Sequence, residues 1–200
     1  MLKGSPDSSG SDEREASLNV ATMTRAALMA AVTAVAAQIA IPLPFSPVPF
    51  TLQVPAVVLS GLLLGSRHGA LAQAIYVLVG AVGVPVFAGF KGGLGVIFGP
   101  TGGYLLSYPL AAAVAGMAAY AVARSPRRAA LTSSFLWGTT ALAVIYAIGA
   151  GWLSVVTDLP LVVAVAQGVL PFVVFDLVKV VLAALVAVAA APAIAAASRT

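Results

Sequence analysis

The sequence predicts an all-α integral membrane protein with about six transmembrane helices and both termini in the cytoplasm. Of the 200 residues, 61% are hydrophobic and only 8% are charged, whereas soluble domains have roughly 45–50% apolar and about 25% charged residues. Beyond residue 23, the apolar residues form long segments separated by short breaks. One transmembrane helix takes about 20 residues, so this region has room for roughly six helices and none for a large soluble catalytic domain.

The two ends of the chain differ in composition from this apolar region. Residues 1–23 begin with a stretch rich in Ser, Asp, Glu and Gly, a composition typical of a disordered tail. A signal peptide is not expected, because the acidic segment runs into an apolar helix that continues without a cleavage site. We expect a disordered cytoplasmic tail over 1–23, a six-helix transmembrane domain over 24–192 and a cytoplasmic tail over 193–200.

Each break between the expected helices contains residues that do not continue a membrane helix. The first helix is expected at residues 24–41 and ends where a proline-rich segment, 42–49, begins; these prolines hold the chain extended. The other helices are expected at residues 52–65, 69–84, 104–123, 130–153 and 169–191. A Gly-rich connection, 85–103, and a polar break, 157–160, separate the later helices.

The basic residues predict the orientation of the helices. With six helices and an internal N-terminus, seven arginines fall on the cytoplasmic side, and Lys91 alone falls outside. These arginines are Arg14, Arg25, Arg67, Arg124, Arg127, Arg128 and Arg199. Cytoplasmic loops are enriched in Lys and Arg, so we expect a multi-pass protein of the cell membrane with both termini inside.

Several function classes are disfavoured by composition. The chain has no cysteine, which excludes disulfides, thiolate catalysis and cysteine-ligated metal centres. The single histidine, His68, lies in a short polar break where we expect a solvated side chain, so neither a metal site nor a cofactor is predicted. The net charge of +4 comes from basic residues scattered between apolar segments, and nucleic acid is therefore not an expected partner.

The strongest functional signal is a pair of charged residues inside the sixth expected helix, Asp176 and Lys179. A charge near the membrane centre costs about 2.5–3.5 kcal/mol on insertion scales, so such residues are rare without a function. Their spacing of three places them on one helical face, where they can neutralise each other. The pair is either an internal bridge or the recognition site of a polar, uncharged ligand group such as a urea or amide.

Two external segments are further candidates. The Gly-rich segment 89–104 allows close backbone approach and is either a binding loop or a structural turn. The proline-rich segment places Thr51 and Gln53 at the mouth of the second helix, where they serve ligand binding or merely end the helix. Trp137 and Tyr146 in the fifth helix either line the site or pack in the core or an interface.

Small residues recur on the first expected helix. Ala26, Ala30 and Ala34 repeat every fourth residue, with Ala27 and Ala31 in the adjacent register. Small residues at this spacing let membrane helices approach closely. The stripe serves either internal packing or contact with a partner.

Together these segments resemble the BioY family, the biotin-specific substrate-binding components (S components) of energy-coupling factor (ECF) transporters. The resemblance covers about residues 24–191, and its most specific parts are residues 44–53, residues 99–104 and the motif 176–179. It implies a six-helix fold that captures biotin from outside. It also implies partners, namely one transmembrane coupling subunit and two ATPase subunits that drive uptake.

The resemblance also implies roles for individual residues. The acid and lysine of the sixth helix and the loop between the third and fourth helices are the expected biotin contacts, and the small residues of the first helix are the expected contact with the coupling subunit. The candidate biotin-binding residues are Asp176, Lys179, Tyr104, Lys91, Phe90, Phe87, Gln53 and Thr51. The cation that meets the biotin carboxylate stays open between lysines 91 and 179.

Two alternatives remain beside this interpretation. One is a stand-alone carrier of biotin or another vitamin, in which titration of Asp176 couples uptake to protons. The other is an intramembrane enzyme using Asp176 as a base, which is disfavoured because neither a nucleophile nor a second intramembrane carboxylate accompanies it.

Overall fold

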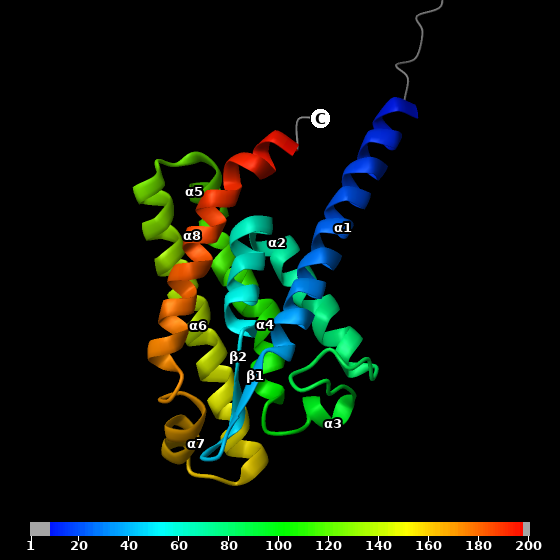
Figure 1. Ribbon diagram of the computed structural model, residues 1–200. Coiled ribbons are helices and arrows are strands. Elements are labelled where there is room, and N and C mark those ends of the chain that lie inside the picture. Colours follow the sequence, from blue (N-terminus) through cyan, green and yellow to red (C-terminus); the bar gives the residue numbers. More distant parts are fainter. Residues whose placement is uncertain (1–8, 198–200) are drawn as a thin grey trace, which may run out of the picture.

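The computed structural model describes the backbone of residues 9–197 and the side chains of residues 20–193. The elements are α1 (Ser9–Gln38), β1 (Ala40–Leu43), β2 (Ser46–Thr51), α2 (Gln53–Ala81), α3 (Leu94–Ile97), α4 (Gly102–Ala115), η1 (Gly116–Ala118), α5 (Ala119–Arg124), α6 (Arg127–Thr157), α7 (Leu161–Gly168) and α8 (Val173–Ala197). The long helices form an elongated bundle (Figure 1). Both ends of the described chain lie at one end of this bundle, and the β-hairpin, α3 and α7 lie at the other.

The predicted helical membrane fold is confirmed, whereas the count of six spans is not. Five helical segments of the described chain are long and apolar enough to cross a membrane, namely Val20–Gln38, Gln53–Ala81, Gly102–Arg124, Arg127–Thr157 and Val173–Ala193. The second and third expected helices, 52–65 and 69–84, both fall within α2. The difference in count therefore comes from α2 alone.

The helix α2 folds back on itself at Gly65. This residue has φ 78° and ψ 173°, a conformation that is essentially restricted to glycine. The Nε2 of Gln53 donates to the Tyr76 hydroxyl at 2.7 Å, and the Nε2 of Gln73 donates to the Ser60 hydroxyl at 3.1 Å. In a straight helix, residues 53 and 76 would lie about 35 Å apart at 1.5 Å per residue. The two arms of α2 therefore run antiparallel, as the sequence predicts for two successive helices.

Glycines allow this hairpin to pack closely against the helix that follows it. A Cβ atom on Gly61 would collide with the carbonyl oxygen of Ala112 in α4, and one on Gly116 would collide with the backbone at Ser66. Small residues have the same role in close helix packing within membranes. The turn of α2 therefore lies in close contact with α4 and η1.

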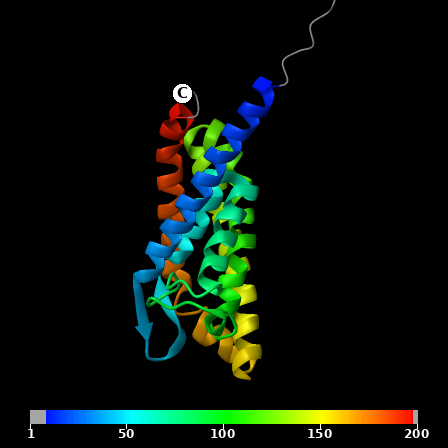
Figure 2. The ribbon, with the colours of Figure 1, turned by 90° about the vertical axis from the view of Figure 1, so that its right-hand side faces the viewer.

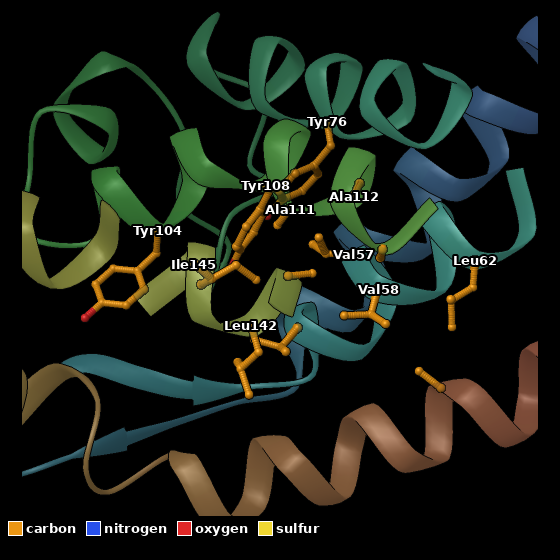
Figure 3. Close-up of a cluster of buried hydrophobic side chains, with 14 of the residues drawn as sticks. Val57, Val58, Leu62, Tyr76, Tyr104, Tyr108, Ala111, Ala112, Leu142 and Ile145 are labelled. Carbon is orange, nitrogen blue, oxygen red and sulfur yellow. The ribbon is translucent and has the colours of Figure 1, made fainter. Parts of the chain in front are cut away.

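The core lies between α2, α4 and α6 and includes a pair of tyrosines. Tyr76 and Tyr108 stack with their ring centroids 6.4 Å apart, and Val57, Val58 and Ile145 are buried around them (Figure 3). The ring of Tyr104 lies at the edge of this cluster, with its hydroxyl directed away from it. The core therefore ends at Tyr104, which lines a cavity together with polar side chains such as Tyr146 and Asp176.

The proline-rich segment forms an antiparallel β-hairpin, with Ala40 paired to Thr51 and Leu43 to Ser46. The expected extended conformation is therefore present, but as a two-stranded sheet in a fold predicted to be wholly helical. Prolines are tolerated in such an edge strand because its outward N–H groups have no ladder partner to lose. The hairpin lies beside the bundle at the end opposite the chain termini (Figure 2).

The remaining differences concern the ends of helices. The helix α1 begins at Ser9, so the backbone of residues 9–23 is helical where the composition predicts a disordered tail; Ser and Asp favour a helix start and Glu continues it. At the other end, α8 continues to Ala197, beyond the expected end at residue 191. Residues 1–8 and 198–200 of the expected tails lie outside the described chain. The short helix α7 (Leu161–Gly168) is absent from the predicted elements, because its eight residues are too few for a membrane span.

Candidate functional site

Asp176 and Lys179 form a buried ion pair on α8. The Nζ of Lys179 lies 2.8 Å from Oδ1 of Asp176, and the two residues are only 7% and 4% exposed, respectively. The i,i+3 spacing brings both side chains to one face of the helix, as the sequence predicts. A buried pair requires further hydrogen bonds to offset the loss of water.

The end of β2 supplies such partners for the lysine. Its Nζ donates to the backbone carbonyl of Thr51 at 2.7 Å, and it lies 3.6 Å from the centroid of the Phe50 ring. Phe50 also contacts Phe172 and Phe175 of the α8 region, with ring centroids 6.5 and 5.6 Å away. The end of β2 is thereby tied to α8, although the two segments are far apart in the sequence.

The aspartate is held from the opposite side by Tyr146 of α6, whose hydroxyl donates to Oδ2 at 2.7 Å. Each carboxylate oxygen therefore has one protein donor. Since each also has two lone pairs, both retain the capacity to accept from a ligand N–H. Of the two fifth-helix candidates, Tyr146 thus joins the site, whereas Trp137 packs against the hydrophobic core.

The ion pair opens onto a cavity of about 120 Å³ between the β-hairpin, the Gly-rich connection and helices α4, α6 and α8. Seven of the eight predicted binding residues line this cavity, namely Asp176, Lys179, Tyr104, Lys91, Phe87, Gln53 and Thr51. The eighth, Phe90, does not: it is 72% exposed and has a φ of 57°, which turns it outward. The structure therefore brings together segments spread over most of the chain.

The polar residues at the start of α2 form a hydrogen-bonded chain beside the cavity. The Thr51 hydroxyl donates to Oε1 of Gln53 at 3.0 Å, and Nε2 of Gln53 donates to the Tyr76 hydroxyl. Tyr76 in turn donates to the carbonyl of Val86 at 3.2 Å. These hydrogen bonds hold both the Oε1 and the Nε2 of Gln53. The Gln53 side chain therefore has a fixed orientation in the wall of the cavity before a ligand binds.

The Gly-rich connection, 85–103, forms one wall of the cavity. Phe87 and Lys91 pair through two backbone hydrogen bonds, of 2.9 and 3.3 Å, which closes a tight loop between them. Phe87 is buried at 1% exposure against Tyr76, whereas the side chain of Lys91 is exposed at the mouth of the cavity. Tyr104 is buried and donates to the carbonyl of Gly168 at 2.9 Å, which holds α7 against α4.

The alanines of α1 divide between two faces. Ala26 and Ala30 are buried inside the molecule, at 0% and 7% exposure, and Ala34 is partly buried against the core. Ala27 and Ala31 are exposed. Ala26 and Ala30 therefore pack inside the molecule, whereas Ala27 and Ala31 of the adjacent register lie on an exposed face of α1.

Several lining residues were not predicted, because they carry no charge and no unusual spacing. They include Tyr108, Ile145 and Phe172; each looks like an ordinary apolar residue of a membrane helix in the sequence.

Among the described residues there is no cluster of three or more His, Asp or Glu side chains that could hold a metal ion. The site therefore offers hydrogen bonds to a ligand, next to an ion pair whose two charges neutralise each other.

The fold and the site define a helical membrane protein with a cavity near one end of the bundle, lined mainly by apolar and aromatic side chains beside a buried ion pair. A model of the BioY family matches residues 11–196, and the chain belongs to this family. It is 46% identical to the biotin transporter BioY of Thermotoga maritima over 82% of this chain and 92% of that protein. It is 40% identical to the biotin transporter BioY of Rhodobacter capsulatus over 74% of this chain and 80% of that protein.

A solved structure gives the same relationship at the level of the fold. The crystal structure of the S-component for biotin from an ECF-type ABC transporter superposes with a TM-score of 0.75 and 26% sequence identity. The match covers 86% of this chain and 91% of that one. The resemblance found in the sequence is thus confirmed for the family and for the fold.

Proposed function

We propose that this protein captures biotin from outside the cell and serves as the substrate-binding component of an ECF-type transporter. The observation that carries this proposal is the buried pair of Asp176 and Lys179 beside an apolar and aromatic cavity. Family membership and the names of the relatives support it. They also favour transport over an intramembrane enzyme that uses Asp176 as a base.

The proposed ligand matches the chemistry of the cavity. Biotin has a ureido ring with two N–H donors and one carbonyl, an apolar thioether body and a carboxylate tail. The free lone pairs of Asp176 accept from the ureido N–H groups, and Lys179 donates to the ureido carbonyl. Phe87 and Tyr104 lie along the apolar body. The carboxylate is placed at the cavity mouth near Lys91, the cation that is exposed to water.

We further propose that both termini face the cytoplasm and that each arm of α2 crosses the membrane. Arg25, Arg67 and Arg124 then lie on the cytoplasmic side, whereas Lys91 and Asp158 lie outside, in agreement with the preference of basic residues for the inner side. The cavity opens toward the outer side in this orientation. Biotin can therefore reach it without first crossing the bilayer.

Accumulation of biotin requires energy from partners in this proposal. The expected partners are a transmembrane coupling subunit and two ATPase subunits, and the exposed register of Ala27 and Ala31 on α1 is the proposed contact with the coupling subunit. No cofactor is expected. A stand-alone carrier driven by protons is the competing mechanism, since Asp176 is a titratable group inside the membrane.

Binding by the purified protein tests the proposed ligand. The full chain in detergent should bind biotin tightly and should not bind thiamine or riboflavin. Failure of correctly folded protein to bind biotin would overturn the proposal. Uptake into cells with and without the ATPase subunits then separates the two mechanisms: uptake that stays undiminished without them and depends on protons would favour the stand-alone carrier.

A further inference from the structure

The loop 86–91, which borders the cavity, is held by side chains from two other parts of the chain, Tyr76 through the carbonyl of Val86 and Gln38. Gln38 is the last residue of α1 and does not line the cavity. Its Nε2 donates to the carbonyl of Ala34 within α1 at 3.0 Å and to the carbonyls of Val86 and Phe87 in the loop at 3.2 and 3.3 Å, so its two N–H groups are shared among three acceptors. Its Oε1 accepts from the backbone N–H of Phe90 at 2.9 Å. A single amide therefore binds both sides of the tight loop between residues 86 and 91.

The geometry of the loop makes these hydrogen bonds important. Phe90 has a φ of 57°, a conformation that costs a non-glycine residue of order 1 kcal/mol and persists only where its surroundings hold it. The N–H of Phe90 is bound by Gln38 alone among the described residues. The loop also includes Gly89 with φ 71°, so its backbone has no strong preference of its own for this conformation.

The loop carries two cavity residues whose positions depend on its conformation. Phe87 and Lys91 are the two residues joined by the backbone bridge at its base, and Gln38 binds the carbonyl of Phe87 itself. The other cover of the cavity, the β-hairpin, follows α1 directly in the sequence and contributes residues 47–49 to the lining. Both covers are thus attached to the same end of α1, one covalently and the other through Gln38.

We propose that Gln38 is a positioning residue for ligand binding. Its amide keeps the loop 86–91 closed over the cavity and thereby sets how long a bound ligand stays. This inference rests on the proposed function for the identity of the ligand, biotin. The amide suits this role because it has both donors and an acceptor. A side chain with only an acceptor loses the hydrogen bonds to the carbonyls of Val86 and Phe87, and one with only donors loses the hydrogen bond from the N–H of Phe90.

Three variants of the full-length protein test this inference. Gln38→Met keeps the length of the side chain but removes all its hydrogen bonds to the loop, and Gln38→Glu keeps an acceptor for Phe90 while placing a carboxylate against two carbonyls. The matched control is Gln167→Met, a partly buried glutamine on α7 outside the cavity lining. Biotin dissociation is followed by stopped flow, and amide hydrogen exchange of residues 86–91 is followed in ligand-free protein.

Gln38→Met should release biotin about tenfold faster than the unchanged protein, because the loss of the hydrogen bonds is worth about 1.4 kcal/mol. Gln38→Glu should release it faster still, and Gln167→Met at the unchanged rate. In both Gln38 variants the amides of the loop should exchange faster than before, whereas those of α6 should not. Melting temperatures should stay close to that of the unchanged protein.

The outcomes separate this inference from the proposed function. If the unchanged protein does not bind biotin, the proposed function fails, while hydrogen exchange still decides whether Gln38 holds the loop. If the protein binds biotin and both Gln38 variants retain its dissociation rate and its exchange at residues 86–91, the inference is wrong. Should Gln38→Met fail to fold, Gln38→Glu carries the same comparison.

Discussion

The hydroxyl of Tyr146 on α6 donates a 2.7 Å hydrogen bond to Oδ2 of Asp176 on α8, the oxygen that Lys179 leaves free. The carboxylate is thereby fixed from two helices at once. Its orientation toward the cavity does not depend on the ligand, which lowers the entropic cost of binding. Several consequences of this arrangement and of the surrounding fold can be measured.

Removal of the Tyr146 hydroxyl should weaken biotin binding without unfolding the protein. In Tyr146→Phe the carboxylate loses one of its two protein donors, and a hydrogen bond to a charged group is worth about 1.5–3 kcal/mol. The dissociation constant measured by calorimetry should rise about tenfold or more. Tyr120→Phe is the control, because Tyr120 is 71% exposed and lies outside the cavity lining; an equal loss in both variants would contradict a role for the hydrogen bond.

The charges of Asp176 and Lys179 should be strongly coupled. Asp176→Asn and Lys179→Met each leave the other charge buried without its partner, and such a change costs about 3–5 kcal/mol of stability. The double variant should melt at a higher temperature than either single variant, yet it should not bind biotin. Normal binding by both single variants would show that the pair is only structural.

The role of Lys91 can be separated from that of Lys179 by changing the ligand. If Lys91 pairs with the biotin carboxylate, Lys91→Met should weaken binding of biotin about tenfold, which corresponds to an exposed charge-assisted contact of about 1.4 kcal/mol. Binding of biotin methyl ester, which lacks the charge, should be unchanged by the substitution. Equal effects on acid and ester would assign the carboxylate to another group.

The exposed register of α1 gives a prediction about partners. Ala31→Trp should prevent assembly with the coupling subunit, because a large side chain keeps two helices apart, and biotin binding by the isolated protein should be retained. Ala143→Trp, at an exposed position on α6, is the matched control and should still assemble. Co-purification with a tagged coupling subunit measures both, and assembly of the Ala31 variant would exclude this face.

The turn of α2 should not tolerate a side chain at Gly65. Its φ of 78° and ψ of 173° are nearly inaccessible to alanine, so Gly65→Ala should destabilise the fold by about 1–3 kcal/mol. Gly151→Ala is the control, since Gly151 lies within α6 with open space where its Cβ would be. That variant should melt at the same temperature or slightly higher; an equally stable Gly65→Ala would argue against the sharp turn.

The sequence predicts most of the bundle because lipid leaves few alternatives to helices for long apolar segments. It also predicts the central pair, since Asp176 and Lys179 stand out where charge is costly. The count of spans differs because the sequence predicts two helices at 52–65 and 69–84, whereas the structure has one helix, α2, that turns through a single backbone conformation at Gly65. The helix α7 is not predicted either, because its eight residues are too few for a membrane span.

Other features depend on contacts that no local pattern records. Tyr146 and Phe50 acquire their roles only when α6 and β2 reach α8, and the sequence gives their residue types without their partners. The outward turn of Phe90 depends on a hydrogen bond to Gln38, which lies more than one helix away in the chain. Similarly, the two alanine registers of α1 can be distinguished only after the helix has packed on α2.

The position of the ion pair on α8 has a consequence for how the protein is made. The helix follows the other four candidate spans of the described chain, so it enters the membrane after them, and it brings both buried charges with it, including the lysine that reaches back to the carbonyl of Thr51. Each charge resists entry into lipid, but α8 has the highest mean hydropathy of the five spans. The apolar residues of α8 therefore offset the cost of carrying the two charges into lipid, and the pair gains its contacts with Tyr146 and Thr51 only when α8 packs against α6 and β2.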